Sequence, residues 1–310
     1  MRELPEYSPA PRGTSMDRRR FLAAAGGALA AAALPGAALL PASDEAHAPG
    51  PGRALRAREH IERVGLQLYT IRGEVGRDFA GSLAHVSRIG YREVEFAGYF
   101  EHTPAQVSEI LKANGLTAPG AHVPLERLRT ELSTVIHEAM VVGHDYIVCP
   151  ALPEKERDPD GYAHLVEALN GAGQTARAAG VGVAYHNHDF DFAPFPDGSR
   201  PYDYLLAHLD PRLVQLELDL FWATKAGADP LDLFGRAPGR FPMVHVKDMD
   251  ASGGMTDVGK GKIDWARIFA QYRRAGIRHY FVEHDEPADP WTTVTDSYEY
   301  LRQLSFASAA

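Results

Sequence analysis

Short apolar runs alternate along the chain with longer stretches in which apolar residues recur about every 3.6 positions, beginning at Val64. The short runs predict buried strands, and the longer stretches predict helices that cover those strands with one apolar face. The predicted strands are residues 64–68, 93–97, 117–123, 146–149, 181–188, 214–220, 243–248 and 280–285. The predicted helices are residues 79–89, 104–114, 125–142, 161–179, 203–208, 229–236, 265–275 and 292–304.

Eight successive strand–helix pairs predict an α/β fold. Their number and the length of chain they occupy match a single (β/α)8 TIM barrel. An open doubly wound sheet is the structural alternative. No Gly-x-Gly-x-x-Gly motif follows the first predicted strand, so a dinucleotide-binding sheet lacks its usual signature. We therefore expect a barrel over residues 63–306, with a linker at residues 49–62 before it.

Residues 1–48 have the pattern of an export signal. Residues 18–22 read Arg-Arg-Arg-Phe-Leu, and residues 23–40 are uncharged and rich in alanine, glycine and leucine. The first part resembles the twin-arginine signal, which directs folded proteins to the twin-arginine export machinery. Small side chains and Pro35 favour cleavage over a membrane anchor. We expect a periplasmic or extracellular protein with no stable membrane insertion after processing. Met16, just before the motif, is an alternative start of the chain.

The charge balance argues against a nucleic-acid partner. The chain has 41 acidic and 32 basic side chains, a net charge of −9, and residues 1–48 contain five of each sign. The acidity therefore belongs to the rest of the chain, whereas proteins that follow a nucleic-acid backbone carry a basic surplus. The single cysteine, Cys149, excludes an intramolecular disulfide and a multi-cysteine metal site. Fourteen histidines favour nitrogen and oxygen ligands if a metal is bound.

Polar residues interrupt the last four predicted strands near their C-terminal ends, where strands of such a barrel carry the chemistry. Side chains alternate between the two faces of a strand, so the following pairs share a face: His186 and His188, Glu217 and Asp219, His245 and Lys247, Glu283 and Asp285. One side chain from each strand gives the predicted metal ligands His186, Asp219, His245 and Glu283. Two imidazoles and two carboxylates suit one divalent ion, Mn²⁺, Co²⁺, Zn²⁺ or Mg²⁺. A hydrogen-bonded polar network without metal is the alternative.

Two residues beside this set are candidates for catalysis together with Glu283. Lys247 shares a face with His245. With its pKa lowered by a nearby cation, it would donate a proton to a developing enolate oxygen or polarise it. The alternative for Lys247 is a salt bridge to Glu217 or Glu283. His188 is a candidate proton shuttle or orienting residue.

Five further residues are candidates for binding the substrate: Gln67, Tyr69, Glu95, His122 and Trp222. Glu95 would hydrogen-bond a sugar hydroxyl or instead pair with an arginine, and His122 would face the pocket or cap the next helix. The other three would line the pocket or be ordinary packing residues, since aromatic faces suit sugar C–H surfaces. The glycine-rich segment 253–261 is a candidate lid.

From Val64 to about Leu304 the chain resembles the xylose isomerase-like TIM-barrel superfamily, in its sugar phosphate isomerase/epimerase group. The matching segments are residues 64–70, 93–98, 186–188, 217–219, 245–248, 258–261 and 282–284. The resemblance implies a metal held by a Glu, an Asp, a His and a Glu from strands five to eight. Asp219, His245 and Glu283 match that pattern, and His186 replaces the first glutamate. In the epimerases both glutamates also move protons, so this replacement argues against the two-glutamate route of epimerisation and leaves metal binding intact.

The residues and the resemblance together predict a metal-dependent enzyme that abstracts a proton next to the carbonyl of a sugar or keto-sugar. Isomerisation or epimerisation is the leading expectation. A lyase or hydratase acting on 3-keto sugars or glycosides is the rival. An abasic-site endonuclease and a non-catalytic sugar-binding barrel are the alternatives from other classes. The expected partner is a small sugar or sugar derivative, and such barrels often pair, so a homodimer is possible.

Overall fold

The computed structural model of the chain describes residues 58–308. The export signal, the alternative start and most of the linker were predicted for residues that lie outside this range. The export signal, the processing of the chain and its destination therefore stay predictions.

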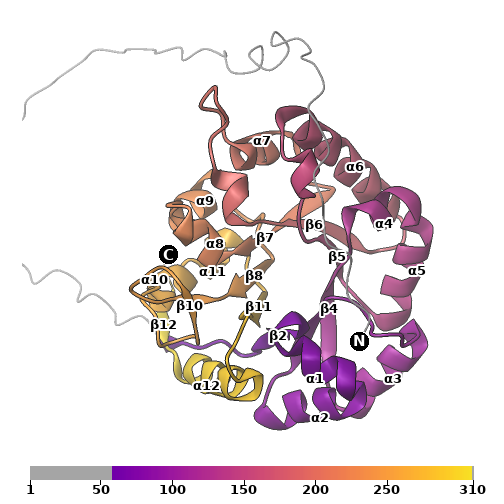
Figure 1. The fold of residues 1–310 in the computed structure, drawn as a ribbon, viewed down its shortest axis with the longest axis vertical. Coiled ribbons are helices and arrows are strands. Elements are labelled where there is room, and N and C mark those ends of the chain that lie inside the picture. The colour runs from indigo at the N-terminus through magenta and orange to yellow at the C-terminus, as the bar shows by residue number, and fades with distance from the viewer. Residues whose placement is uncertain (1–57, 309–310) are drawn as a thin grey trace, which may run out of the picture. The chain divides into compact units, whose positions relative to one another are not determined.

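Within residues 58–308, eight parallel strands close into a barrel in which they follow one another around the ring in chain order (Figure 1). They are β2 (Gly65–Gln67), β3 (Glu93–Phe96), β4 (Thr117–His122), β5 (Tyr146–Cys149), β6 (Gly182–His186), β7 (Val214–Asp219), β8 (Met243–Val246) and β11 (His279–Val282). The last strand, β11, pairs with β8 and with β2 and so closes the ring. The predicted α/β TIM barrel is confirmed.

Helices surround the ring of strands and cover its outer face (Figure 1). They are α1 (Arg72–Arg77), α2 (Phe79–Ile89), α3 (Pro104–Ala113), α4 (Leu125–Thr130), α5 (Leu132–Val142), α6 (Pro159–Arg177), α7 (Pro201–His208), α8 (Leu220–Lys225), α9 (Pro230–Arg236), α10 (Trp265–Phe269), α11 (Tyr272–Ala275) and α12 (Pro290–Gln303). The helix predicted over residues 125–142 is two helices, because Glu131 leaves the helical conformation at φ −129° and ψ 23°. Among residues 58–308, every helix is too short or too polar to cross a lipid bilayer.

Three strands end two or three residues earlier than the sequence predicts. The ladders of β6, β8 and β11 stop at His186, Val246 and Val282. His188, Lys247 and the segment from Glu283 to Asp285 therefore lie on the connections that leave the barrel. These connections carry the polar side chains that gather at its C-terminal end.

Two short antiparallel pairs accompany the barrel. β1 (Arg58–Glu59) pairs with β12 (Phe306–Ala307) and ties the two ends of the described chain together. β9 (Asp248–Met249) pairs with β10 (Met255–Thr256) just after β8.

An apolar floor fills the barrel interior below the polar strand ends. It consists of Tyr146, Val148, Ala184, Met243 and Phe281, all buried. Gly65 leaves room for this packing, since a Cβ there would lie 2.5 Å from the Phe281 ring. The larger core lies between the strands and the helices, where Leu216 and Leu218 of β7 point. By alternation Glu217 and Asp219 face the barrel interior.

Candidate metal centre at the mouth of the barrel

A buried polar cluster occupies the C-terminal end of the barrel in two layers, with two histidine rings between them. The deep layer consists of the buried Gln67, Glu95 and Glu217 with the partly exposed His122. The mouth layer consists of the buried Asp219, Lys247 and Glu283 with the partly exposed Asp285. His186 and His245 contact carboxylates of both layers.

Three imidazoles converge on one oxygen of the deep layer. Glu217 Oε2 lies 2.9 Å from His122 Nε2, 3.0 Å from His186 Nδ1 and 3.2 Å from His245 Nε2. Glu95 Oε2 lies 2.7 Å from His245 Nε2 and accepts a 2.8 Å hydrogen bond from the Gln67 amide. Both glutamate side chains are completely buried.

His186 and His245, the two histidines shared by both layers, face the mouth layer with their opposite nitrogens. His245 Nδ1 lies 2.6 Å from Glu283 Oε2 and 4.0 Å from Asp219 Oδ2. His186 Nε2 lies 3.7 Å from the same Asp219 oxygen. Asn187 fixes the backbone there, since its side-chain oxygen accepts a 3.0 Å hydrogen bond from the Asp219 N–H.

The residues of the mouth layer and the two histidines fit a divalent cation. Asp219, His245 and Glu283 offer donor atoms within 4.8 Å of one another, and His186 Nε2 faces the same aspartate. Asp219 Oδ2 is buried and pairs with the Lys247 ammonium at 3.0 Å, whereas Oδ1 caps α8. Carboxylate oxygens beside imidazole nitrogens are the donor chemistry of a site for a divalent transition metal. His122, His186, Glu217 and His245 form a second group of the same compactness.

Burial and mutual contact shift the charges of the deep layer. Burial, with Glu217 nearby, raises the pKa of Glu95 to about 7. Burial alone would also raise the pKa of Glu217, but His245, His122 and His186 hold it well below its ordinary value. Burial lowers the pKa of His186 well below its usual range, together with the neighbouring His245. The pKa of His245 is raised despite burial, because Glu217 and Glu283 both contact the ring.

Lys247 is the cation of the mouth layer. Its Nζ lies 2.7 Å from Glu283, 3.0 Å from Asp219 and 2.9 Å from Asp285. These carboxylates raise the pKa of Lys247 against the effect of burial, which differs in direction from the sequence prediction. The sequence prediction considered only a bound metal cation and not the three carboxylates around the ammonium. Lys247 forms the salt bridge to Glu283 that the sequence analysis gave as an alternative. Its other partners are Asp219 and Asp285, whereas the sequence analysis named Glu217. Burial raises the pKa of Asp219 to about 6.

His188 and Trp222 form a wall beside the mouth layer. Their rings are 5.7 Å apart, and His188 also stacks on Phe190. The Lys247 ammonium lies 5.6 Å from the Trp222 ring centre. His188 Nδ1 and Trp222 Nε1 are buried and have no hydrogen-bond partner among the described residues. Burial, with Lys247 nearby, lowers the pKa of His188 to about 3, so the ring is neutral near pH 7.

The other predicted substrate-binding residues lie in different places. Gln67 and Glu95 are fully buried and hydrogen-bonded to each other, and among residues 58–308 Glu95 has no arginine partner. His122 contacts Glu217 and does not cap α4. Tyr69 is 41% exposed at the rim, with the Arg72 guanidinium 4.1 Å from its ring centre.

Glu217 and Asp285 were not assigned a role from the sequence. Their alternation with Asp219 and Glu283 placed them on the correct face. Taking one residue per strand left them out, and only the three-dimensional structure shows that both contact the cluster.

A buried carboxylate supports the turn that carries His188. Asp191 accepts hydrogen bonds from the hydroxyls of Tyr162 at 2.6 Å and Tyr185 at 2.9 Å. Its other oxygen accepts a 2.8 Å hydrogen bond from the His188 backbone N–H. Burial raises the pKa of Asp191 to about 6 in spite of these bonds.

Asp248 anchors the glycine-rich segment that was predicted as a lid. Its buried carboxylate accepts hydrogen bonds from the backbone N–H groups of Met249, Gly259, Gly261 and Ile263, and from the Trp265 indole. Lys260 of the same segment pairs with Asp296 of α12 at 2.7 Å. The segment is therefore fastened at several points beside the barrel.

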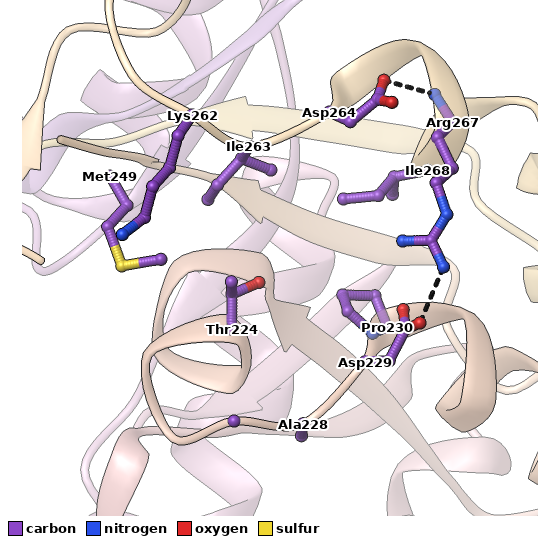
Figure 2. Close-up of a pocket in the computed structure, with 11 residues that line it drawn as sticks. Thr224, Ala228, Asp229, Pro230, Met249, Lys262, Ile263, Asp264, Arg267 and Ile268 are labelled. Atoms are coloured by element: carbon purple, nitrogen blue, oxygen red, sulfur yellow. Dashed lines mark hydrogen bonds and ion pairs between the residues drawn. The ribbon is translucent and has the colours of Figure 1, made fainter. Parts of the chain in front are cut away.

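A hollow of about 420 Å³ lies away from this cluster, beside α8, α9 and α10 (Figure 2). Met249, Lys262 and Asp229 line it, and none of the predicted site residues does. Its aspartates already have partners, since Asp229 pairs with Arg267 at 2.7 Å and Asp264 caps α10 (Figure 2). The hollow therefore shares no residue with the polar cluster.

A protein-family model described as xylose isomerase-like TIM barrel matches residues 83–304. The chain belongs to this family. The matched range contains His186, Asp219, His245 and Glu283, and it confirms the resemblance to the xylose isomerase-like TIM barrel.

Individual relatives of this xylose isomerase-like barrel carry several names. An inosose dehydratase from Geobacillus kaustophilus (strain HTA426) is 24% identical over 270 residues, which cover 72% of this chain and 86% of the relative. A sugar phosphate isomerase/epimerase from Parabacteroides distasonis ATCC 8503 is 24% identical, with a TM-score of 0.71 over 79% of this chain and 99% of that one. The IOLI protein, whose crystal structure has a bound zinc atom, is 17% identical, with a TM-score of 0.61 over 76% and 95% of the two chains. At these identities the solved structures show the fold.

Proposed function

We propose that the protein is a divalent-metal-dependent enzyme that removes the proton next to the carbonyl of a keto-sugar or keto-cyclitol, after which a β-substituent leaves. The observation that carries this proposal is the convergence of Asp219, His245 and Glu283 on one buried point with Lys247 in contact. The inosose dehydratases among the relatives support a dehydratase or lyase outcome.

His186, Asp219, His245 and Glu283 would hold the ion. When bound, the ion draws electron density from the substrate carbonyl and makes the adjacent C–H bond more acidic.

The protein side chains provide a base and an acid for such an elimination. Glu283 accepts the proton from carbon, and the Lys247 ammonium gives a proton to the oxygen that leaves from the β-carbon. The C–H and C–O bonds break, a C=C bond forms, and water or an alcohol departs. Because Glu283 and Lys247 are 2.7 Å apart, the proton can pass between them and restore both groups for the next cycle.

The identity of residue 186 favours elimination over epimerisation in this proposal. Two-base epimerisation needs a second carboxylate opposite Glu283, and His186 stands where the epimerases carry it. Isomerisation or epimerisation is the second candidate outcome, because Asp219 is a further carboxylate beside Glu283 at the mouth.

Incubation in D₂O separates these outcomes. The Mn²⁺-loaded protein is mixed with ketoses, inososes and 3-keto glucosides, and the products are followed by NMR and ultraviolet absorbance. We expect an absorbing enone and a released alcohol or water from one class of keto substrate. A deuterated epimer or isomer without an enone would identify the second candidate. Neither product, and no deuterium in any substrate, would contradict the proposal.

Glu283→Gln tests the base directly. The turnover should fall by about 10²–10⁴-fold, because a general base is lost together with a metal ligand. Glu286→Gln is the matched control, since Glu286 is exposed and only three residues away, and its turnover should stay at the wild-type value. A purely sugar-binding barrel would bind sugar with no turnover in any variant. An abasic-site endonuclease would cut abasic DNA at low salt, and we expect no cutting.

We also propose that residues 1–48 export the protein through the twin-arginine route. Replacement of Arg18 and Arg19 by lysine should retain the protein inside the cell, whereas the unmodified chain should reach the periplasm or medium. Equal distribution of the two forms would contradict this proposal.

A further inference from the structure

The two shared histidines each use one nitrogen toward the deep layer and the other toward the mouth layer. His186 Nδ1 lies 3.0 Å from Glu217 Oε2, while its Nε2 faces Asp219. His245 Nε2 lies 2.7 Å from Glu95 Oε2 and 3.2 Å from Glu217 Oε2, so Glu95 is its nearer partner, while its Nδ1 faces Glu283. His186 therefore presents Nδ1 to the deep layer and His245 presents Nε2, although both rings connect the same two layers.

A neutral imidazole carries one N–H and one lone pair, and a carboxylate can only accept a hydrogen bond. The glutamate behind each ring therefore keeps the N–H on His186 Nδ1 and on His245 Nε2. His245 Nδ1 also faces a carboxylate, Glu283 at 2.6 Å, so a cation bound there would replace a proton on that nitrogen. The cation would then meet the lone pairs of His186 Nε2 and His245 Nδ1. A histidine that ligates a metal is usually oriented in this way by an acceptor at its other nitrogen.

We infer that Glu217 and Glu95 are positioning residues of the metal centre: Glu217 sets the tautomer of His186, and Glu95 sets that of His245. This inference rests on the proposed function, since it assumes that the cation binds among the mouth-layer carboxylates. It assigns a role to two completely buried glutamates.

The surroundings of the two glutamates suit this role. Gln67 holds Glu95 from the side with a 2.8 Å hydrogen bond, and the Gln67 side chain is itself fixed by the Tyr69 backbone N–H. Gly120 leaves the space that Glu95 needs, since a Cβ there would lie 2.5 Å from Glu95 Oε1. His122 holds Glu217 from the other side at 2.9 Å. Each carboxylate is thus placed before any cation arrives.

The experiment is NMR of the full-length protein with ¹⁵N-labelled histidine and ¹¹³Cd²⁺ as the metal probe. We expect one-bond ¹¹³Cd–¹⁵N coupling at His186 Nε2 and His245 Nδ1, with N–H protons on His186 Nδ1 and His245 Nε2. Coupling at His186 Nδ1 and His245 Nε2 would overturn the inference, because Glu217 would then be a ligand in the second donor group. Protein that takes up no cadmium would contradict the proposed function and the inference together.

Single variants separate the two positioning roles. Glu217→Gln should weaken cadmium affinity by about 10–100-fold and change the His186 signal while the His245 coupling stays. Glu95→Gln should do the reverse. Glu286→Gln is the control and should change neither signal. Identical changes at both histidines in both variants, or unchanged affinity and couplings, would overturn the assignment of one glutamate to each ring. Wild-type couplings test the inference even if a variant fails to fold.

Discussion

Burial controls the ionisation of individual side chains in this barrel. Glu95, Asp191 and Asp219 are fully buried, and their pKa values are raised to about 7, 6 and 6. Lys247 is buried as well, yet three carboxylates raise its pKa. The same physical cost of burying charge thus gives different outcomes, because the partners differ from residue to residue.

Asp191→Asn tests the buried carboxylate that supports the His188 turn. The pKa of Asp191 is about 6 when folded, above the ordinary value of 3.8, so the folded protein binds this proton more tightly than the unfolded chain. This contribution to stability is present at acidic pH and is lost as pH rises from about 4 to 6. Its full size is about 3 kcal/mol.

The measurement for Asp191→Asn is the difference in thermal midpoint between variant and wild type at pH 4.5 and at pH 7.5. The difference should shift in favour of the variant at the higher pH, because asparagine stays neutral. A difference that is independent of pH would contradict the raised pKa.

At the residue scale, the sequence predicted which face the polar side chains occupy. Period-two alternation placed His186, His245 and Glu283 correctly on the interior side. It did not reveal that Glu217 lies under three imidazoles, because contacts between strands depend on their register. The contacts of Lys247 with Asp219 and Asp285 were missed for the same reason.

At the scale of elements, the alternation of apolar patterns predicted every barrel strand, and the ends of elements were the difficult part. The polar residues that follow β6, β8 and β11 were predicted to be strand, although the chain has already left the ladder there. The apolar period also continues across residues 125–142, so the break at Glu131 between α4 and α5 has no counterpart in the pattern. Side-chain periodicity reports which face is buried, and backbone breaks leave it unchanged.

Asp248→Asn tests what holds the segment after β8. The carboxylate accepts five hydrogen bonds, and an asparagine has only one acceptor oxygen, so several N–H groups would lose their partner. We expect a loss of about 3 kcal/mol in the free energy of unfolding.

The Asp248→Asn variant should also be cleaved faster by trypsin at Lys260 and Lys262 than the wild type. Asp250→Asn is the control, because Asp250 bonds only within its own exposed turn. Equal cleavage of the Asp248 variant and the wild type would show that the carboxylate does not fasten the segment.

At the scale of the whole molecule, the barrel brings together more negative than positive charge. Glu95, Glu217, Asp219, Glu283 and Asp285 meet at one end of the barrel. Among the described residues, Lys247 is the one lysine in contact with them. A divalent cation would relieve this imbalance, and the family fold supplies the apolar floor beneath it.

Adding a divalent metal and then removing it with a chelator should therefore change the free energy of unfolding of the whole barrel. Saturation at a free metal concentration of 100 times Kd adds about 2.7 kcal/mol, which corresponds to a rise of roughly 5–10 °C in Tm for a domain of this size. Chelation should reverse the rise. Asp219→Asn should lose most of it, whereas Glu286→Gln should keep it. A Tm that does not respond to Mn²⁺, Co²⁺ or Zn²⁺ would contradict the metal centre.

The most direct test of the account is the position of the ion in crystals of the Mn²⁺-loaded protein, located by anomalous scattering. The account predicts one strong peak bounded by His186 Nε2, Asp219 Oδ2, His245 Nδ1 and Glu283. A peak between His122 and Glu217 in the deep layer, or no peak in the barrel at all, would contradict it.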